Sequence, residues 1–346
     1  MKRITLQALI LLSVAAISCS GGSDRQPVTG APGTGNAVYY WKTTYRLSDW
    51  DKDFLKGNDI RRIYLRMFDV AVDFNWSSGA EEVMPIATTK FEHERWHNPP
   101  VEIVPVVYVT LDAIRKMGDD TGRYADLIVT RVFAMGEYNN LGAIKEVQLD
   151  CDWTESTRDT YFELCKATGN LLKNRGCALS STIRLHQLRQ PCPPVDRGVL
   201  MLYNTGSFKN PNEDNSILSL EDVTPYLRNV LYRLPLDFAY PAFNWRILFS
   251  DGKFRAILHN PVLMDWEFET SGNIHRATCR TTIEGHDIKE GDIIRTETSD
   301  FSEIMKVKQL VGKRFRSRQG RTILYHLDSL NLSKYSSDEI HSIFSD

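Results

Sequence analysis

The chain has 346 residues, 42 basic and 44 acidic, with a net charge of −2 and no block of basic residues. This balance argues against a nucleic acid as the main partner, because nucleic-acid-binding domains carry a clustered positive surface. The length suits one large domain with an insertion or two smaller domains. Seven tryptophans are compatible with sugar-stacking surfaces, although burial in a core is the commoner fate of any single one.

The first residues predict a secretory signal over residues 1–18. Two basic residues precede an apolar run over 4–17, which is too short to span a bilayer, and small residues follow. The segment ending at Cys19 (Ala-Ile-Ser-Cys) resembles a bacterial lipobox, with Ala16 where Leu is usual. The resemblance implies cleavage before Cys19 and acylation of that residue. Plain secretion with an incidental cysteine is the alternative.

Residues 20–36 are rich in Gly, Ser, Pro and Thr and should form a flexible tether. Together with the acylated Cys19, residues 19–36 would hold the protein on the cell envelope through a lipid anchor in the membrane. The other five cysteines have no Cys-x-x-Cys spacing, so we expect neither a disulfide framework nor a zinc site.

Eight β-rich runs follow, separated mostly by helical patterns. The expected strands cover residues 38–45, 62–70, 101–109, 146–153, 178–185, 199–204, 237–248 and 322–328. Helices are expected over 49–56, 124–138, 157–173 and 301–315. We expect no helix in 71–100, which carries Trp76, Trp96, His93 and His97, nor at the proline-rich segment 190–194. This order predicts an α/β fold, a (β/α)8 TIM-like barrel over 37–253 and 301–346, with a small β-rich insertion at 254–300 before the last helix and strand.

The fourth expected strand is the most informative. Its side chains alternate between an apolar face and a polar face that includes Asp150 and Asp152. Two carboxylates therefore point the same way at the carboxyl end of a strand, where parallel α/β barrels keep their binding site. The alternative is that both are solvated residues at a strand exit, capping the helix that follows.

Other strand ends add polar and aromatic candidates. Thr182, Arg184 and His186 share a face of the fifth expected strand, and polar faces on central strands are costly unless they line a cleft or a satisfied hydrogen-bond network. The expected catalytic residues are Asp150, Asp152 and Asp328. The expected substrate-binding residues are Arg184, His186, Tyr203, Asn204, Asn244, Trp245 and His326, and Asp69 and Tyr108 lie at further strand ends. Scattered His and Asp without a His-x-His or His-Glu-x-x-His pattern predict no metal, and no cofactor is expected.

Asp150-Cys151-Asp152-Trp153, the Met-Leu-Tyr-Asn segment at 201–204 and Trp245 resemble motifs of family 18 glycoside hydrolases, the chitinase-type barrels. Those enzymes carry Asp-x-x-Asp-x-Asp-x-Glu on the fourth strand and use the acetamido group of the substrate as nucleophile. Here Val147 stands at the first Asp and Thr154 at the acid Glu, while Glu155 comes one residue too late to share the strand face. The resemblance implies a glycan-active barrel that lacks the proton donor in its usual place.

The segments 148–154, 184–187 and 325–328 are also similar to uncharacterised TIM-barrel lipoproteins of the Bacteroidetes, a resemblance that implies no activity. The expected function is a glycan-active envelope protein, a glycoside hydrolase-like barrel that uses clustered carboxylates on an oligosaccharide or polysaccharide. The alternative is a non-catalytic carbohydrate-binding lipoprotein on a degenerate barrel. An assembly or scaffold role for the β-rich insertion is a third possibility.

Overall fold

The computed structural model describes residues 35–92, 101–259, 262–315 and 320–345. The expected signal peptide, the acylation of Cys19 and nearly all of the expected tether lie outside these residues, as do His93, Trp96 and His97. Within the described ranges, no helix is long and apolar enough to cross a membrane.

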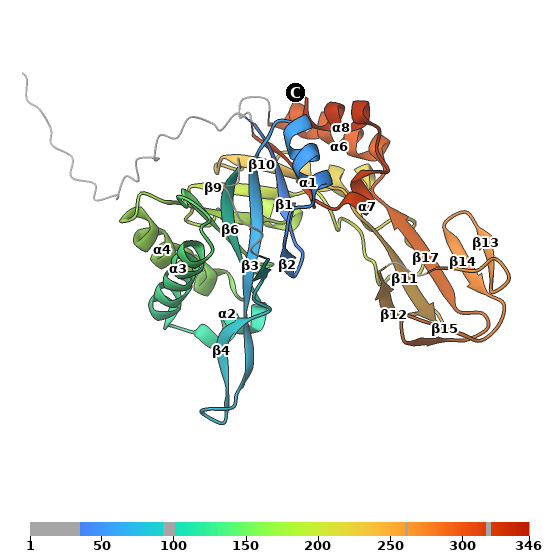
Figure 1. Ribbon diagram of the computed structural model, residues 1–346, viewed down its shortest axis with the longest axis horizontal. Helices are drawn as coiled ribbons and strands as arrows, with labels where there is room; N and C mark the ends of the chain where they lie inside the picture. Colours follow the sequence, from blue (N-terminus) through green and yellow to red (C-terminus); the bar gives the residue numbers. More distant parts are fainter. Residues whose placement is uncertain (1–34, 93–100, 260–261, 316–319, 346) are drawn as a thin grey trace, which may run out of the picture.

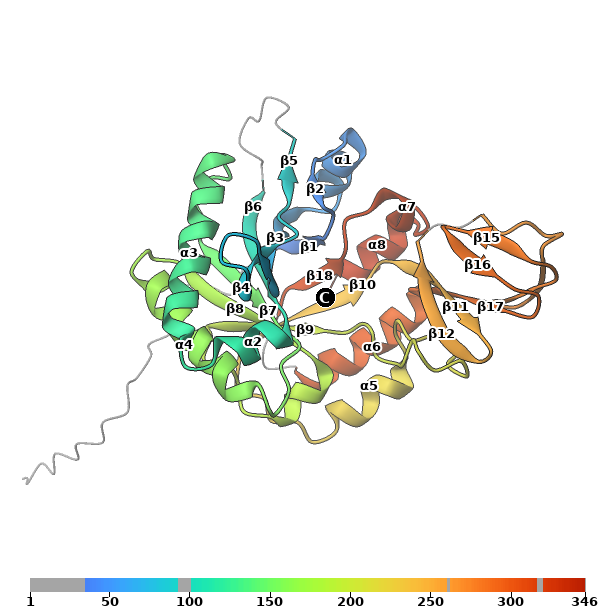
Figure 2. The ribbon, with the colours of Figure 1, turned by 90° about the horizontal axis from the view of Figure 1, so that it is seen from below.

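Eight parallel strands form a closed barrel, so the predicted (β/α)8 fold is confirmed (Figures 1 and 2). The first strand, β1, pairs with both the second and the last barrel strand, and this pairing closes the ring. The barrel strands are β1 (Asn36–Tyr40), β3 (Ile60–Asn75), β6 (Glu102–Val109), β7 (Glu146–Asp150), β8 (Ala178–Ile183), β9 (Arg197–Met201), β10 (Leu236–Pro241) and β18 (Thr322–Tyr325).

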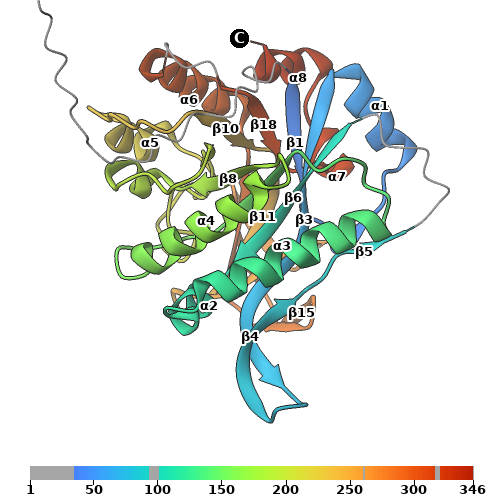
Figure 3. The ribbon, with the colours of Figure 1, turned by 90° about the vertical axis from the view of Figure 1, so that its left-hand side faces the viewer.

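The helices cover the outside of the barrel, and Figure 3 shows α3 and α4 side by side on one flank. The predicted helices are present as α1 (Asp49–Gly57), α3 (Thr121–Tyr138), α4 (Arg158–Lys173) and α6 (Phe301–Arg314). Polar caps begin several of them; Asp300, for example, accepts a hydrogen bond from the Glu303 amide at the start of α6. The sequence did not predict the short helices α2 (Leu111–Met117), α5 (Leu220–Leu227), α7 (Ser329–Leu332) and α8 (Ser337–Phe344).

The two helix-free connections agree with the sequence. In the described part of the link between β3 and β6, the chain forms β4 (Ala80–Ile86), which pairs antiparallel with the outer half of β3, and β5 (Lys90–Phe91), which pairs with β2 (Thr44–Tyr45). A 3-10 turn, η1 (Leu185–Arg189), is the only helical segment described between β8 and β9.

The insertion begins earlier than expected. The predicted strand 237–248 is two strands, because β10 ends at Pro241 and β11 (Asn244–Ser250) leaves the barrel to pair with β12 and β17. Ala242 and Phe243 continue the apolar character of β10 across the break, so composition does not mark the change of partner. The sheet consists of β11, β12 (Lys253–Leu258), β13 (Phe268–Ser271), β14 (Ile274–Ala277) and β17 (Ile293–Thr298), with a hairpin of β15 (Thr281–Ile283) and β16 (His286–Ile288).

The insertion enters and leaves the barrel at neighbouring points. The Phe243 carbonyl, just before β11, accepts hydrogen bonds from the amide (3.2 Å) and the hydroxyl (2.7 Å) of Ser299, just after β17. The insertion and the β3–β4 hairpin project from the same end of the barrel (Figure 1). The carboxyl-terminal half of β3 extends beyond the barrel at this end, so the insertion and the hairpin both flank the carboxyl ends of the strands.

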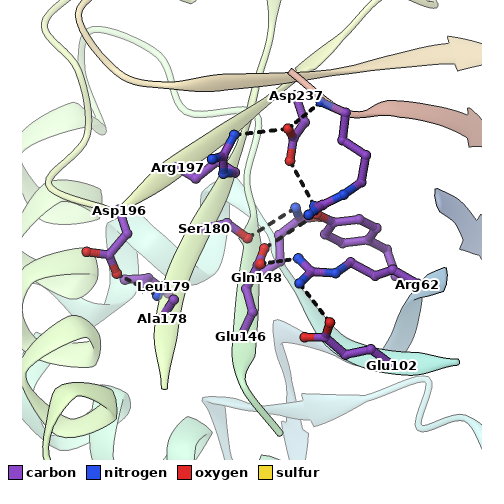
Figure 4. Close-up of polar contacts among 12 residues, drawn as sticks. Arg62, Glu102, Glu146, Gln148, Ala178, Leu179, Ser180, Asp196, Arg197 and Asp237 are labelled. Atoms are coloured by element: carbon purple, nitrogen blue, oxygen red, sulfur yellow. Dashed lines mark hydrogen bonds and ion pairs between the residues drawn. The ribbon is translucent and has the colours of Figure 1, made fainter. Parts of the chain in front are cut away.

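The amino ends of the strands enclose an ionic network inside the barrel (Figure 4). Arg62 donates to Glu102 (2.8 Å) and to Glu146, and its side chain is only 14% exposed. Asp237 accepts from Arg197 (3.0 Å) and Arg321 (3.2 Å). Each buried charge has a partner of opposite sign, which offsets the cost of removing it from water.

We predict that Arg62→Met destabilises the fold by about 3 kcal/mol at neutral pH, because it leaves the buried Glu146 without its cation. Arg61→Met is the matched control. Arg61 is the neighbouring residue, 69% exposed and paired with the exposed Asp59, so its loss should cost less than about 1 kcal/mol. Urea unfolding of both variants measures the difference, and equal losses would contradict the prediction.

Candidate functional site

Asp150 ends β7 inside the barrel, at the carboxyl end of the strand. Its side chain is almost completely buried, with the residue 4% exposed, and one carboxyl oxygen accepts a hydrogen bond from the Thr182 hydroxyl of β8 (2.7 Å). The next residue, Cys151, packs in the apolar core outside the barrel, so the predicted alternation of faces holds here.

Burial raises the pKa of the Asp150 carboxyl to about 6. The nearby Asp152 and Asp69 carboxylates raise this pKa further, whereas the Arg184 guanidinium and the Thr182 hydrogen bond lower it. Loss of hydration raises the pKa because it penalises the charged form, and it is the largest of these effects. Asp150 therefore titrates close to neutral pH instead of near 4.

Two arginine–carboxylate pairs surround Asp150. Arg184, after β8, forms an ion pair with Asp152, and its guanidinium lies 5.8 Å from the centre of the Tyr203 ring. Arg66 on β3 donates to both oxygens of Asp69 (2.9 and 2.5 Å). Each of these carboxylates has a guanidinium in direct contact, whereas Asp150 bonds to the Thr182 hydroxyl.

Aromatic rings line the same end of the barrel. Tyr203, after β9, stacks on Tyr325 of β18 with 4.5 Å between ring centroids. Tyr325 also contacts Trp41 (5.8 Å) and Phe243 (5.9 Å), and Arg66 lies 5.9 Å from the Trp41 ring. Tyr108 on β6 is half-buried, and burial, followed by Asp152 and Asp150, raises its pKa to about 12. Carboxylates, guanidinium groups and rings thus meet at one place, which we call the barrel mouth.

The structure does not place Asp328 as the opposing carboxylate. Asp328 is the N-cap of α7, where it accepts a hydrogen bond from the Leu330 amide (2.8 Å). The strand β18 ends at Tyr325, so strand alternation does not extend to residue 328. The carboxylates that act on Asp150 are Asp152 and Asp69.

His186 and Asn204 were also expected to face the site, but the strands end before them. His186 lies exposed on η1, since β8 ends at Ile183. Asn204 is exposed with a φ of 54°, a left-handed backbone that breaks the extended run after β9.

Asn244, Trp245 and His326 lie at the edge of the mouth. Asn244 donates to Asn331 (2.5 Å) and lines a separate cavity of about 290 Å³ at the base of the insertion. Trp245 lies 5.4 Å from Phe243, one ring away from the Tyr203–Tyr325 stack. His326 has a buried Nδ1 without a hydrogen-bond partner, and burial lowers the pKa of its imidazole.

Sequence reasoning missed the side chain that holds Trp245. Glu297 on β17 accepts hydrogen bonds from the Trp245 indole (2.7 Å) and from the amide and hydroxyl of Ser216 (2.9 and 2.6 Å). Its other oxygen accepts from Arg295 (2.7 Å), which also donates to the Asn210 carbonyl (2.7 Å). This fully buried pair joins the insertion to the loop after β9.

Trp41, Arg66 and Tyr325 were missed as site residues although each lies on or beside a predicted strand. Trp41 and Arg66 continue the inward alternation of Tyr39 and Tyr64, and that signal was sufficient to find them. Trp153, in contrast, is fully buried in the core against Tyr161 and Phe162.

The site contains carboxylates but no ready cation site. Among the residues that the structure describes, no three His, Cys, Asp or Glu side chains form a group that could hold a metal ion. Cys151, Cys165, Cys177, Cys192 and Cys279 are all free thiols.

No family model and no curated protein sequence matches the chain. Solved structures do share its fold. A chitinase from Chromobacterium violaceum is 10% identical over 90% of this chain and 98% of its own, with a TM-score of 0.52. A chitinase-like agglutinin from Robinia pseudoacacia is 9% identical over 89% and 99%, with a TM-score of 0.51. A group IV chitinase from Ostrinia furnacalis, in complex with allosamidin, is 11% identical over 90% and 97%, with a TM-score of 0.50.

At these identities the comparisons establish the fold alone. They confirm the resemblance to family 18 chitinase-type barrels at the level of architecture. They leave open which residues carry a function, because one barrel fold hosts many chemistries.

We predict that Asp150→Asn stabilises the protein at pH 7.5 but not at pH 4. A raised carboxyl pKa means that the folded state favours the protonated form, so stability falls as the pH rises from about 4 to 6. Asparagine keeps an acceptor for Thr182 and removes the buried charge. The gain at pH 7.5 has an upper limit of about 3 kcal/mol, since one pKa unit corresponds to about 1.4 kcal/mol. Thermal unfolding at both pH values measures it, and a gain independent of pH would contradict the proposed cause.

Proposed function

We propose that this chain is a glycan-binding protein of the cell envelope that holds its glycan at the barrel mouth. The observation that supports this proposal most directly is a group of partly exposed rings, Trp41, Tyr108 and Tyr325, at the same end of the barrel as the Arg184–Asp152 pair. Sugar rings present C–H faces that pack on aromatic side chains and hydroxyl groups that bond to charged planar groups. The mouth offers both kinds of contact, with the buried Tyr203 packed beneath the Tyr325 ring.

The neighbours in fold support a glycan as the ligand class without deciding the chemistry. Two of them are chitinases and one is a chitinase-like agglutinin. By their names, the same barrel serves both cleavage and agglutination. Function must therefore be argued from the residues of this chain.

Local geometry favours binding over hydrolysis. Glycoside hydrolysis needs a proton donor beside the leaving oxygen and a second carboxylate. Thr154 stands where the family motif has its acid, and its hydroxyl lies within hydrogen-bond distance of Ser156 (3.0 Å) and Thr157 (3.4 Å) in the turn before α4. Asp152, the other carboxyl group of this segment, is held in an ion pair with Arg184.

One observation favours hydrolysis as the second candidate. Asp150 has a pKa of about 6 and lies beside Asp152, and a carboxyl group that titrates near neutral pH next to a second carboxyl group is an arrangement that acid–base catalysis uses. Its burial means that a sugar oxygen would have to reach well into the barrel.

The envelope location is part of the proposal and is supported by the signal and lipobox patterns of residues 1–19. We expect the wild-type protein in the membrane fraction of its native host and a Cys19→Ala variant outside it. Equal retention of both forms would contradict the lipid anchor.

We predict that titration calorimetry with a panel of chitin, peptidoglycan and neutral plant oligosaccharides finds a ligand, and that Arg184→Met weakens its affinity at least about tenfold, or about 1.4 kcal/mol. Arg115→Met is the control, because Arg115 forms an exposed pair with Asp112 on α2. A melting temperature for each variant separates lost affinity from lost folding.

The same samples test hydrolysis. Binding without release of reducing ends supports the binding function. Release of reducing ends that Asp150→Asn and Asp152→Asn abolish supports the second candidate instead. Absence of binding across the panel, or affinity that Arg184→Met leaves unchanged, contradicts a glycan site at the mouth.

A further inference from the structure

A cavity of about 580 Å³ lies on the outside of the barrel, lined by residues of α3 and of the β3–β4 hairpin. Figure 3 shows these elements on one flank of the barrel. Its lining comes from β3, β4 and α3 only. Asp69 of β3 belongs to the mouth, whereas its neighbours Phe68 and Val70 line the cavity, in keeping with the alternation of side chains along a strand. We call this cavity the outer groove, and its lining residues are Phe68, Val70, Val83, Met84, Pro85, Tyr124, Leu127, Ile128, Thr130, Arg131, Ala134, Met135 and Tyr138.

Helix α3 carries two apolar stripes, and only one is used in the core. Ala125, Val129 and Val132 are buried against the barrel. A second stripe, with Leu127, Arg131 and Ala134 at helical spacing, faces the groove. Leu127 is 51% exposed, so this apolar surface remains open to solvent.

Arg131 is the one charged residue among those that line the groove. Its guanidinium lies 5.1 Å from the Phe68 ring and donates one hydrogen bond, to the Thr88 hydroxyl (2.9 Å). Its Nε is buried and has no hydrogen-bond partner. None of the ion pairs among the described residues includes Arg131. A guanidinium group has five N–H donors, so most of its bonding capacity is unused here.

A cation in an apolar groove favours a ligand with a negatively charged head group and an apolar body. Arg131 is partly exposed, and a carboxylate would bind its terminal N–H groups through charge-assisted hydrogen bonds. The rest of the lining is almost entirely apolar and fits a hydrocarbon body. The volume lies within the range of small-molecule sites, roughly 300–1,000 Å³.

We propose that the outer groove binds a free fatty acid, with its chain along the apolar stripe of α3 and its carboxylate on Arg131. The site is separate from the barrel mouth and does not depend on the proposed glycan function. The cation distinguishes a fatty acid from a neutral lipid of the same length, because only the carboxylate pairs with Arg131.

The test compares three twelve-carbon probes on the purified protein, the two ionic probes below their micelle concentrations and the alcohol below its solubility limit. Laurate, dodecanol and dodecyltrimethylammonium share one chain and differ in head-group charge. We expect calorimetry to show laurate binding at least about tenfold tighter than dodecanol, and no detectable binding of the cationic probe. No laurate binding at about 1 mM, or equal affinity for laurate and dodecanol, overturns the proposal.

Variants locate the site. Arg131→Met should lower the laurate affinity about tenfold and remove the preference over dodecanol, and Ala134→Phe should fill the groove and weaken both probes. Arg123→Met is the matched control, because Arg123 lies on the same helix in an exposed pair with Asp120. Laurate affinity that Arg131→Met leaves unchanged overturns the assignment, with unfolding temperatures confirming that each variant is folded.

Sedimentation of the wild type without ligand completes the test. A monomer leaves the groove open, as the proposal requires. A dimer that Ala134→Phe dissociates would show that a second copy of the chain covers the groove, and would overturn the fatty-acid site.

Discussion

Closure of the eight-stranded ring is the constraint on which the other features depend. A closed barrel has no free strand edge, and its interior is too narrow for bulk water, so every inward side chain must be apolar or have a polar partner. The interior accordingly divides into levels. Ion pairs around Arg62 and Asp237 occupy one end, a layer with Tyr39 and Val106 fills the middle, and the Asp150 cluster occupies the other end.

The two polar ends of the barrel compensate the desolvation of their carboxylates in different ways. At the amino ends of the strands, Glu146 and Asp237 each contact an arginine directly. At the mouth, Asp150 has a hydroxyl partner and only a more distant cation, so part of its desolvation cost remains uncompensated. A carboxyl group whose desolvation is only partly compensated, at the carboxyl ends of the strands, is typical of a functional site. A buried carboxylate that is fully paired with arginine contributes to structure instead.

The sequence predicted the architecture because strand alternation and helical spacing are local signals. The inward direction of Asp150 was predicted for the same reason, because it is the last residue of β7, whereas Asp152 lies two residues beyond that strand and pairs with Arg184. Asp328 and His186 were misplaced where alternation was applied beyond the last paired residue of a strand. The role of Glu297 depends on a partner from another element, Ser216, which is 81 residues away, and no local sequence pattern indicates such a contact.

The insertion can change in evolution without disturbing the barrel, because its two ends lie next to each other. The segment from β11 to β17 starts and ends at residues whose backbones already touch, Phe243 and Ser299. Residues can therefore be added to, removed from or exchanged within this segment without changing the register of any barrel strand. What such exchange does alter is the hydrogen-bonded pair of Trp245 and Glu297, because both residues belong to this segment. The rim of the mouth can thus diversify among descendants of this barrel while the closed ring beneath it stays constant.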